Sequence, residues 1–218
     1  MRKARGPGRP AGIRSGEGRD AILAATRELL AERGLPRVTL REVAERADVQ
    51  PALINYYFGS KRGLLREVVR GVAARVRDRL AAAGLRPGDP AERLRHVLRA
   101  VVGAFAEQPY APRLLFEQVL FADDASLDEF AEAYARPNLA VVKQLLEDGR
   151  RAGVLREVDV AFLAPQVIGM LFFFFLSAPL LSRLFEHGEI DAERAERYAD
   201  SAADLVLHGL ALSEPVMP

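Results

Sequence analysis

The sequence predicts an all-α protein with a three-helix N-terminal domain and a larger C-terminal helical domain. Alanine, arginine and leucine, which favour helices, dominate the composition. After residue 17 no segment keeps the apolar/polar alternation of a half-buried strand. Capping residues mark the helix boundaries, as in Thr39 with Glu42 three positions later. These observations favour helices joined by short turns.

The N-terminal helices are predicted from their ends. Residues 17–33 place apolar side chains on one face, and a glycine follows at the position where helices often end. The capping box at Thr39 begins a second helix, and Pro51 suits the first position of a third, which ends at Gly59. Between them residues 48–50 form a tight turn, in which Asp48 is expected to adopt the left-handed conformation.

The larger domain is expected to hold a series of longer helices. Pro109 and Pro112 break the chain, Pro137 is expected to interrupt one helix, and Pro179 to bend or end another. Asp89, Asp159 and Asp191 are expected N-caps. The helices are expected over residues 61–83, 90–108, 112–121, 126–153, 159–182 and 191–209.

Positive charge is concentrated towards the N-terminus. Residues 1–65 contain 13 Lys and Arg against 7 Asp and Glu, whereas the remaining residues contain 18 against 23. This asymmetry is typical of a protein that meets a polyanion with one end. The absence of cysteine excludes disulfides and cysteine-ligated metals, and it fits a reducing cytoplasm.

Residues 1–17 are expected to form a disordered basic arm, because they are rich in Gly, Pro and Arg and lack the apolar segment of a signal peptide. Within the arm, Gly8-Arg9-Pro10 resembles the core of an AT-hook, which inserts arginine into a narrow minor groove. Nonspecific contacts between the arm and phosphates are the alternative.

Residues 39–65 have the pattern of a helix-turn-helix, whose second helix lies in the major groove of DNA. The pattern leaves four side chains of that second helix unburied: Leu53, Asn55, Tyr56 and Tyr57. Exposed aromatic side chains are unfavourable unless something covers them, and phosphates or thymine methyl groups would do so. An asparagine also matches the N6/N7 edge of adenine.

In this stretch the chain resembles the tetracycline-repressor (TetR/AcrR-type) family, over about residues 18–70. The likeness rests on Val38-Thr39-Leu40-Arg41-Glu42-Val43-Ala44 and on Tyr56-Tyr57-Phe58-Gly59-Ser60-Lys61. The resemblance implies phosphate contacts by Thr39, Tyr56, Tyr57 and Lys61, and base contacts by Pro51, Ala52, Leu53 and Asn55. The chain departs from the family at Asn55, where many members carry an aromatic residue, and at Asp48, where many carry glycine.

Residues 160–182 contain no charged side chain and are long enough to cross a bilayer. Pro165, Gln166 and Pro179 argue against a membrane span, and burial in a dimer is the favoured interpretation. The family's dimers pack the last two long helices of each subunit together. The expected interface residues are Phe174, Ala195, Ala199, Ala202, Val206 and Leu210.

The resemblance also implies a ligand pocket among the middle helices of the larger domain. Its expected lining is Phe105, Phe116, Tyr134, Phe162, Gln166, Met170 and Phe173, which suggests a mostly apolar ligand. His96, His187 and His208 lack the spacing of paired metal ligands, and no nucleophile or phosphate-loop motif is present. We therefore expect no enzyme, cofactor or metal site.

The resulting expectation is a cytoplasmic homodimeric repressor that binds a pseudo-palindromic DNA operator and is released by a small apolar or amphipathic ligand. Its expected domains are the basic arm (1–17), the helix-turn-helix domain (18–65) and the effector-binding and dimerisation domain (66–218). Two alternatives remain open. One is an architectural DNA-binding protein without a ligand, and the other is a membrane-associated protein that uses residues 160–182.

Overall fold

The structure is a computed structural model that describes residues 16–185 and 190–211. The expected basic arm, with Gly8-Arg9-Pro10, lies outside this range apart from its last two residues, and so does His187. The chain divides into two compact units, Met1–Val68 and Val69–Pro218. Within the described ranges all regular elements are helical, and the β pairing consists of one isolated bridge between Leu155 and Ala211. The prediction of an all-α fold is confirmed.

The first unit is built around a small apolar core. Ile22, Val43 and Ile54 are fully buried, one from each of the first three α-helices, and Leu64 is 1% exposed. Burying a side chain of this size contributes about 1.5–3 kcal/mol. The helices are α1 (Glu17–Arg33), the short 3-10 helix η1 (Leu35–Arg37), α2 (Leu40–Arg46), α3 (Pro51–Phe58) and the beginning of α4 (Lys61–Gly84).

Local signals determine the helix ends of this unit. The hydroxyl of Thr39 accepts a hydrogen bond from the Glu42 backbone N–H at 3.3 Å, while the Glu42 carboxylate accepts one from the Thr39 backbone N–H at 3.0 Å. This is the predicted capping box. Asp48, in the turn between α2 and α3, has a φ of 52°, so the predicted left-handed conformation is confirmed.

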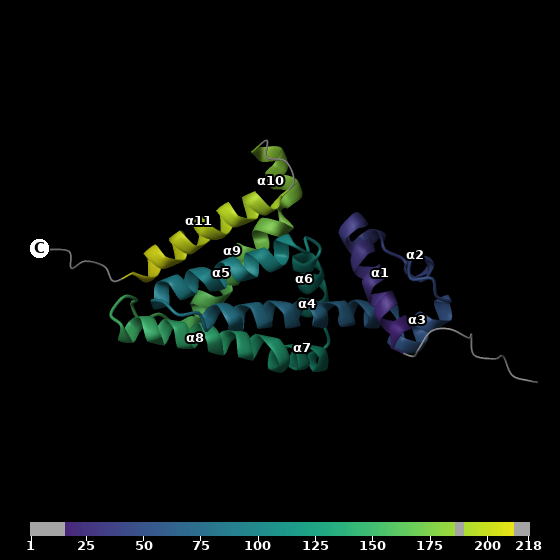
Figure 1. The fold of residues 1–218 in the computed structure, drawn as a ribbon, viewed down its shortest axis with the longest axis horizontal. Helices are drawn as coiled ribbons and strands as arrows, with labels where there is room; N and C mark the ends of the chain where they lie inside the picture. Colours follow the sequence, from purple (N-terminus) through teal and green to yellow (C-terminus); the bar gives the residue numbers. More distant parts are fainter. Residues whose placement is uncertain (1–15, 186–189, 212–218) are drawn as a thin grey trace, which may run out of the picture. The chain divides into compact units, whose positions relative to one another are not determined.

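The second unit contains the rest of α4 and the later helices, several of which lie side by side (Figure 1). One apolar cluster joins Leu80 of α4, Val97 of α5 and Leu145 of α8. α11 packs along α5. The remaining elements are α5 (Pro90–Ala106), α6 (Ala111–Leu120), α7 (Asp124–Phe130), the π-helical turn η2 (Ala131–Ala135), α8 (Arg136–Arg151), α9 (Val160–Leu176), α10 (Ala178–Leu184) and α11 (Ala192–Leu210).

The expected interruption at Pro137 is a change of helix type. α7 runs through η2 into α8, and the backbone N–H of Arg136 donates to the carbonyl of Ala131, five residues earlier. Proline lacks an N–H, and its ring clashes with the carbonyl four residues before it in a regular α-helix. The wider π turn just before Pro137 relieves this conflict and lets the helix continue.

The apolar segment from residue 160 forms two helices. α9 ends at Leu176 and α10 begins at Ala178, with Pro179 in its first turn, and the two axes differ by 69°. The break predicted at Pro179 is therefore present, just before the proline. Within the described ranges no individual helix has both the length and the apolar character of a membrane span. Only α9 and α10 taken together, despite the bend between them, have both.

The small residues of α11 are buried within the single chain, so their place in a dimer interface stays a prediction. Ala195, Ala199, Ala202 and Leu210 are each 1–3% exposed, and α11 packs against α5 of the same chain. Small side chains bring two helices close together, but they do not specify whether the partner helix belongs to the same chain.

Phe174, another expected interface residue, is half-buried and stacks on Tyr198 within the chain, with ring centroids 3.8 Å apart. The Tyr198 hydroxyl donates to the carbonyl of Met170 at 2.7 Å, and burial raises the pKa of this hydroxyl. Val206 is half-buried as well. Phe174 and Val206 therefore keep part of their surface accessible, and Val206 lines a groove along α9 and α11.

Candidate nucleic-acid interface

The outer face of α3 carries the residues expected to contact bases. Ile54 and Phe58 are buried and hold the helix against the unit. The exposed side chains are Pro51, Ala52, Asn55 and Tyr56, whereas Leu53 and Tyr57 are half-buried. The structure thus brings the expected residues onto one short helix, with two of them less exposed than the sequence pattern suggested.

Three consecutive aromatic rings end α3. Tyr56 is 80% exposed and meets Tyr57 edge-on at 5.2 Å between ring centroids, and Tyr57 meets the buried Phe58 at 6.2 Å. Edge-to-face contacts of this kind are favourable. The contacts orient the exposed ring of Tyr56, whose hydroxyl can donate to a phosphate oxygen.

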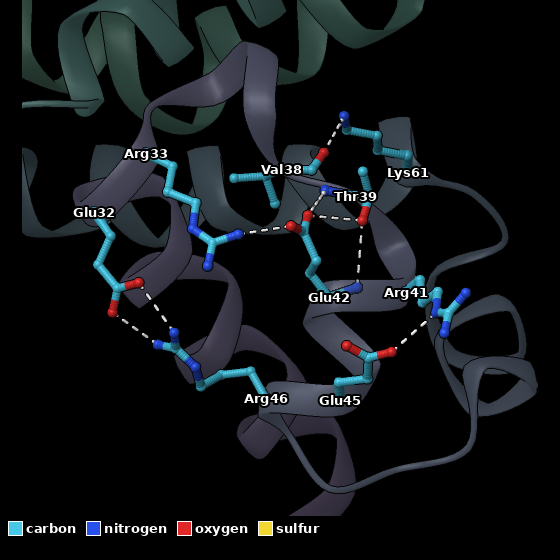
Figure 2. Close-up of polar contacts among 9 residues, drawn as sticks. All are labelled: Glu32, Arg33, Val38, Thr39, Arg41, Glu42, Glu45, Arg46 and Lys61. Atoms are coloured by element: carbon cyan, nitrogen blue, oxygen red, sulfur yellow. Dashed lines mark hydrogen bonds and ion pairs between the residues drawn. The ribbon is translucent and has the colours of Figure 1, made fainter.

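Thr39 is exposed, but its polar atoms already have partners in the capping box (Figure 2). Its hydroxyl donates to the Glu42 carboxylate at 2.7 Å. The hydrogen bonds from Thr39, with a further contribution from Arg33, hold the pKa of Glu42 below its usual range. A phosphate would have to compete with this carboxylate for the Thr39 hydroxyl.

Lys61 begins α4 and is half-buried. Its ammonium group donates a hydrogen bond to the backbone carbonyl of Val38, the residue before Thr39 (Figure 2). A lysine ammonium has three N–H groups, so two remain for other acceptors. The first backbone N–H groups of a helix also lack partners within the helix and attract anions. Lys61 therefore adds a positive charge to a helix terminus that already favours phosphate.

Ion pairs between α1 and α2, which sequence reasoning missed, hold α2 in place (Figure 2). Arg33 pairs with Glu42 at 2.6 Å, and Arg46 contacts Glu32 at 2.8 Å and Glu28 at 3.2 Å. Hydrogen bonding lowers the pKa of Glu32 and raises that of Arg46. Glu28 and Glu32 lie four residues apart on α1, which was the available signal, but the sequence does not specify a partner on another helix.

These pairs change the interpretation of the positive N-terminal region. Arg33, Arg41 and Arg46 each have an acidic partner within the first unit. Five of the 13 basic residues among residues 1–65 lie in residues 1–15, outside the described range. In the described part of this unit, attraction to phosphate therefore depends on individual groups such as Lys61 more than on a large excess of charge.

The seven side chains expected to line a ligand pocket do not meet in one cavity. Phe162, Gln166 and Met170 line an open groove along α9 and α11, with a volume of about 570 Å³. Phe105 lies elsewhere, 1% exposed, with its ring edge-on to Phe172 at 4.9 Å.

The other three expected pocket residues are dispersed. Phe116, on α6, contacts Phe121 at 5.9 Å. Tyr134 lies under the guanidinium of Arg77, at 5.8 Å from its ring centroid. Phe173 is 65% exposed. Of the expected lining, Phe162, Gln166 and Met170 therefore share the described groove, and the ligand pocket stays a prediction.

Two family models match the chain. The family described as "Bacterial regulatory proteins, tetR family" matches residues 22–68, and the one described as "Tetracyclin repressor-like, C-terminal domain" matches residues 88–214. The first match contains α2 and α3 with the capping box between α1 and α2, and the second covers more than half of the chain.

The HTH-type transcriptional regulator BetI of Rhizobium meliloti (strain 1021) is 32% identical over 111 residues, which is 51% of this chain and 53% of that protein. BetI of Burkholderia mallei (strain NCTC 10229) is 40% identical over 86 residues, 39% of this chain and 43% of that protein. The chain thus spans about half the length of the curated relatives it matches.

Solved structures share the fold. The TetR family transcriptional regulator PfmR from Thermus thermophilus has a TM-score of 0.68 at 24% identity, over 88% of this chain and 99% of that chain. A tetR-family regulatory protein from Rhodococcus RHA1 has a TM-score of 0.69 at 20% identity, over 90% and 98%. At these identities the likeness shows the fold alone. The two family matches carry the conclusion that the chain belongs to the tetR family of bacterial regulatory proteins, which are DNA-binding regulators of transcription and not enzymes.

Proposed function

We propose that this regulator is a homodimeric repressor that binds a pseudo-palindromic operator through α3 and is released by a small apolar or amphipathic ligand. The observation that carries the proposal is the outer face of α3. Asn55 and the 80% exposed Tyr56 project from a helix whose other side is anchored by Ile54 and Phe58. A short helix held in this way can enter the major groove without rearranging its own core.

The proposed DNA contacts fall into two classes. Asn55 reads the N6/N7 edge of an adenine, while Pro51, Ala52 and Leu53 offer apolar surface to bases, including thymine methyl groups. Tyr56, Tyr57, Lys61 and Thr39 contact phosphates, which position the helix without reading the sequence. Thr39 makes this contact only by giving up its hydrogen bond to Glu42.

The proposed dimer interface lies on the exposed side of α9 and α11. Phe162, Phe173 and Leu205 are 65–70% exposed, and Ile168 is 54% exposed. Exposed apolar side chains clustered on two neighbouring helices indicate an interaction surface. A second copy that packs here would also cover the open groove, so we assign the groove to the interface. Two-fold symmetry would then set the recognition helices about 34–36 Å apart, or at a multiple of this spacing.

The proposed domains are the arm (1–17), the DNA-binding domain (18–65) and the effector-binding and dimerisation domain (66–218). The proposed location of the protein is the cytoplasm. The ligand acts by favouring an arrangement of the effector-binding domain that holds the two DNA-binding domains of the dimer at a separation that does not match the operator half-sites. A ligand can shift this equilibrium only to the extent that it binds the two arrangements with different affinity.

Selection of bound fragments from a genomic DNA pool tests the proposal. We expect enrichment of an inverted repeat, protection of two half-sites on one face of the duplex, and a binding stoichiometry of two chains per site. Tyr56→Ala, which removes the exposed ring and leaves the core residues in place, should weaken binding to the enriched site and to unrelated duplexes alike. Failure of the wild-type protein to prefer any duplex at low ionic strength would overturn the proposal.

A further inference from the structure

Arg75, on α4 in the second unit, is held by neutral groups. Its Nη2 donates to the side-chain oxygen of Gln108 at 2.7 Å, and the Tyr110 hydroxyl donates to the same oxygen at 2.9 Å. The Nε of Arg75 is shielded from solvent and has no hydrogen-bond partner. Gln108 and Tyr110 belong to the turn between α5 and α6, so this network ties α4 to that turn.

Two arginines of the same unit have carboxylate partners, in contrast to Arg75. Arg79, one turn further along α4, pairs with Glu107 at 2.6 Å, and Arg93 pairs with Asp148 at 3.0 Å. Among the residues that the structure describes, no carboxylate lies within ion-pair distance of Arg75. A partly buried cation with an unsatisfied N–H is unfavourable, and each such group calls for an explanation.

We propose that Arg75, with Gln108 and Tyr110 beside it, is the polar end of the effector site and binds the carboxylate of an amphipathic acid. This rests on the proposed function, because it specifies the ligand class of a ligand-responsive regulator. A carboxylate that reaches Nε satisfies the unpartnered N–H and compensates the charge at the same time.

The surroundings favour an acid with an apolar tail. Tyr110 is 8% exposed, and Phe105, Ala111 and Leu114 from the adjoining turns of α5 and α6 are no more than 1% exposed. A single unpartnered N–H suits a monoanion better than a phosphate dianion, whose three oxygens need several donors. α4 is one continuous helix that also begins with Lys61, so an acid that changes the tie at Arg75 acts on the helix that carries a proposed phosphate contact.

The test uses octanoate, benzoate and phenylacetate, each beside its uncharged primary amide, with the full-length protein and its selected operator. We expect at least one acid to raise the Tm of the wild-type protein and to weaken operator binding tenfold or more at saturation, while the matched amide does neither. Arg75→Gln should abolish the preference for the acid. Arg79→Gln, which removes a neighbouring arginine that has its own carboxylate partner, should retain it.

The proposal is overturned if none of the acids binds better than its amide, or if the preference survives in Arg75→Gln. A second measurement needs no ligand. Arg75→Met should leave the Tm of the free protein unchanged or higher, since it removes an uncompensated cation, and a fall of more than about 4 °C would make Arg75 a structural residue. Operator binding measured without any acid separates the two proposals. If the wild-type protein does not bind the operator, the proposed function is contradicted. If it binds the operator but responds to none of the acids, only the inference about Arg75 is contradicted.

Discussion

The ammonium group of Lys61 donates a hydrogen bond to the backbone carbonyl of Val38, so the first residue of α4 is tied to the residue just before the N-cap of α2. The bond restricts a long, flexible side chain that would otherwise lose more entropy on binding phosphate. It also places a positive charge beside the beginning of α2. Local geometry, more than net charge, therefore makes this corner of the unit a candidate phosphate site.

Lys61→Met should weaken binding to all duplexes to a similar degree. Because one phosphate contact is lost, the slope of log K against log salt concentration should fall by about one unit. Fluorescence anisotropy with the operator and with an unrelated duplex, over a range of salt concentrations, measures both effects. Lys61→Arg keeps the charge and serves as the control. An unaltered salt slope in Lys61→Met would show that Lys61 makes no phosphate contact.

Asn55→Ala should relax the preference at one base position of each half-site, by about 1–3 kcal/mol. Asn55 is exposed, so removal of its amide leaves the core of the unit unchanged. Tyr56→Phe, which loses only a hydroxyl, should instead weaken binding to all sequences alike. Binding measured on a library of single-base operator variants distinguishes the two patterns. If Asn55→Ala lost affinity equally for all operator variants, Asn55 would contact the DNA backbone and not a base.

Gly63→Ala should destabilise the first unit strongly. A Cβ atom at this position would lie 2.0 Å from the backbone oxygen of Phe58, which cannot move without displacing the end of α3. Overpacking of this kind costs about 1–3 kcal/mol or more. Gly103→Ala, in α5, is the control, because its Cβ would have no neighbour within 4 Å and alanine favours a helix by up to about 1 kcal/mol. Thermal unfolding that ranks the two variants in the opposite order would contradict this account.

The sequence was informative wherever a structure depends on residues close together in the chain. The capping box at Thr39, the left-handed Asp48 and the bounds of α1 and α3 follow from local chemistry, and the structure has them as predicted. The π turn before Pro137 was missed, because the sequence shows where a proline conflicts with a helix but not how the backbone accommodates it.

Features that depend on residues far apart in the chain were less predictable. A stripe of small residues indicates close helix packing but not which helix it meets: Ala199 is already 1% exposed in the single chain, on a helix that packs along α5. Similarly, an inventory of aromatic residues could not show that Phe105 packs in the core while Phe162 lines an open groove. The neutral partner of Arg75 had no signal in the sequence, because it depends on how α4 meets the turn after α5.

Phe173→Glu should convert the proposed dimer to monomers without unfolding the chain. Phe173 is 65% exposed in the single chain, so a carboxylate is tolerated there until a second copy buries it. Ala199→Glu should behave differently, since this position is 1% exposed in the single chain, and the variant should lose stability by several kcal/mol. Sedimentation velocity and circular dichroism on both variants provide the comparison. A dimeric Phe173→Glu protein would move the interface to another face.

Acid should loosen the junction of α1 and α2 through Glu42. Hydrogen bonds from Thr39, with a contribution from Arg33, lower the pKa of this carboxyl in the folded protein, whereas a free glutamate has a pKa of about 4.3. A lowered folded pKa means that the stabilisation is fully present above about pH 4.3 and is lost as the pH falls through the folded value. Amide hydrogen exchange in α2, corrected for the intrinsic rate at each pH, should therefore show protection that declines with acid.

Glu42→Gln separates the charge from the cap. Glutamine can still accept a hydrogen bond from the Thr39 backbone N–H, but it cannot pair with Arg33 or lose its acceptor on protonation. The variant should have weaker protection at neutral pH and a flatter decline in acid. Glu45→Gln, which removes an exposed pair with Arg41 outside the capping box, should follow the wild-type curve. If Glu42→Gln retains the full wild-type pH dependence, the acid response arises from another carboxylate at this junction, with Glu32 opposite Arg46 the next to replace.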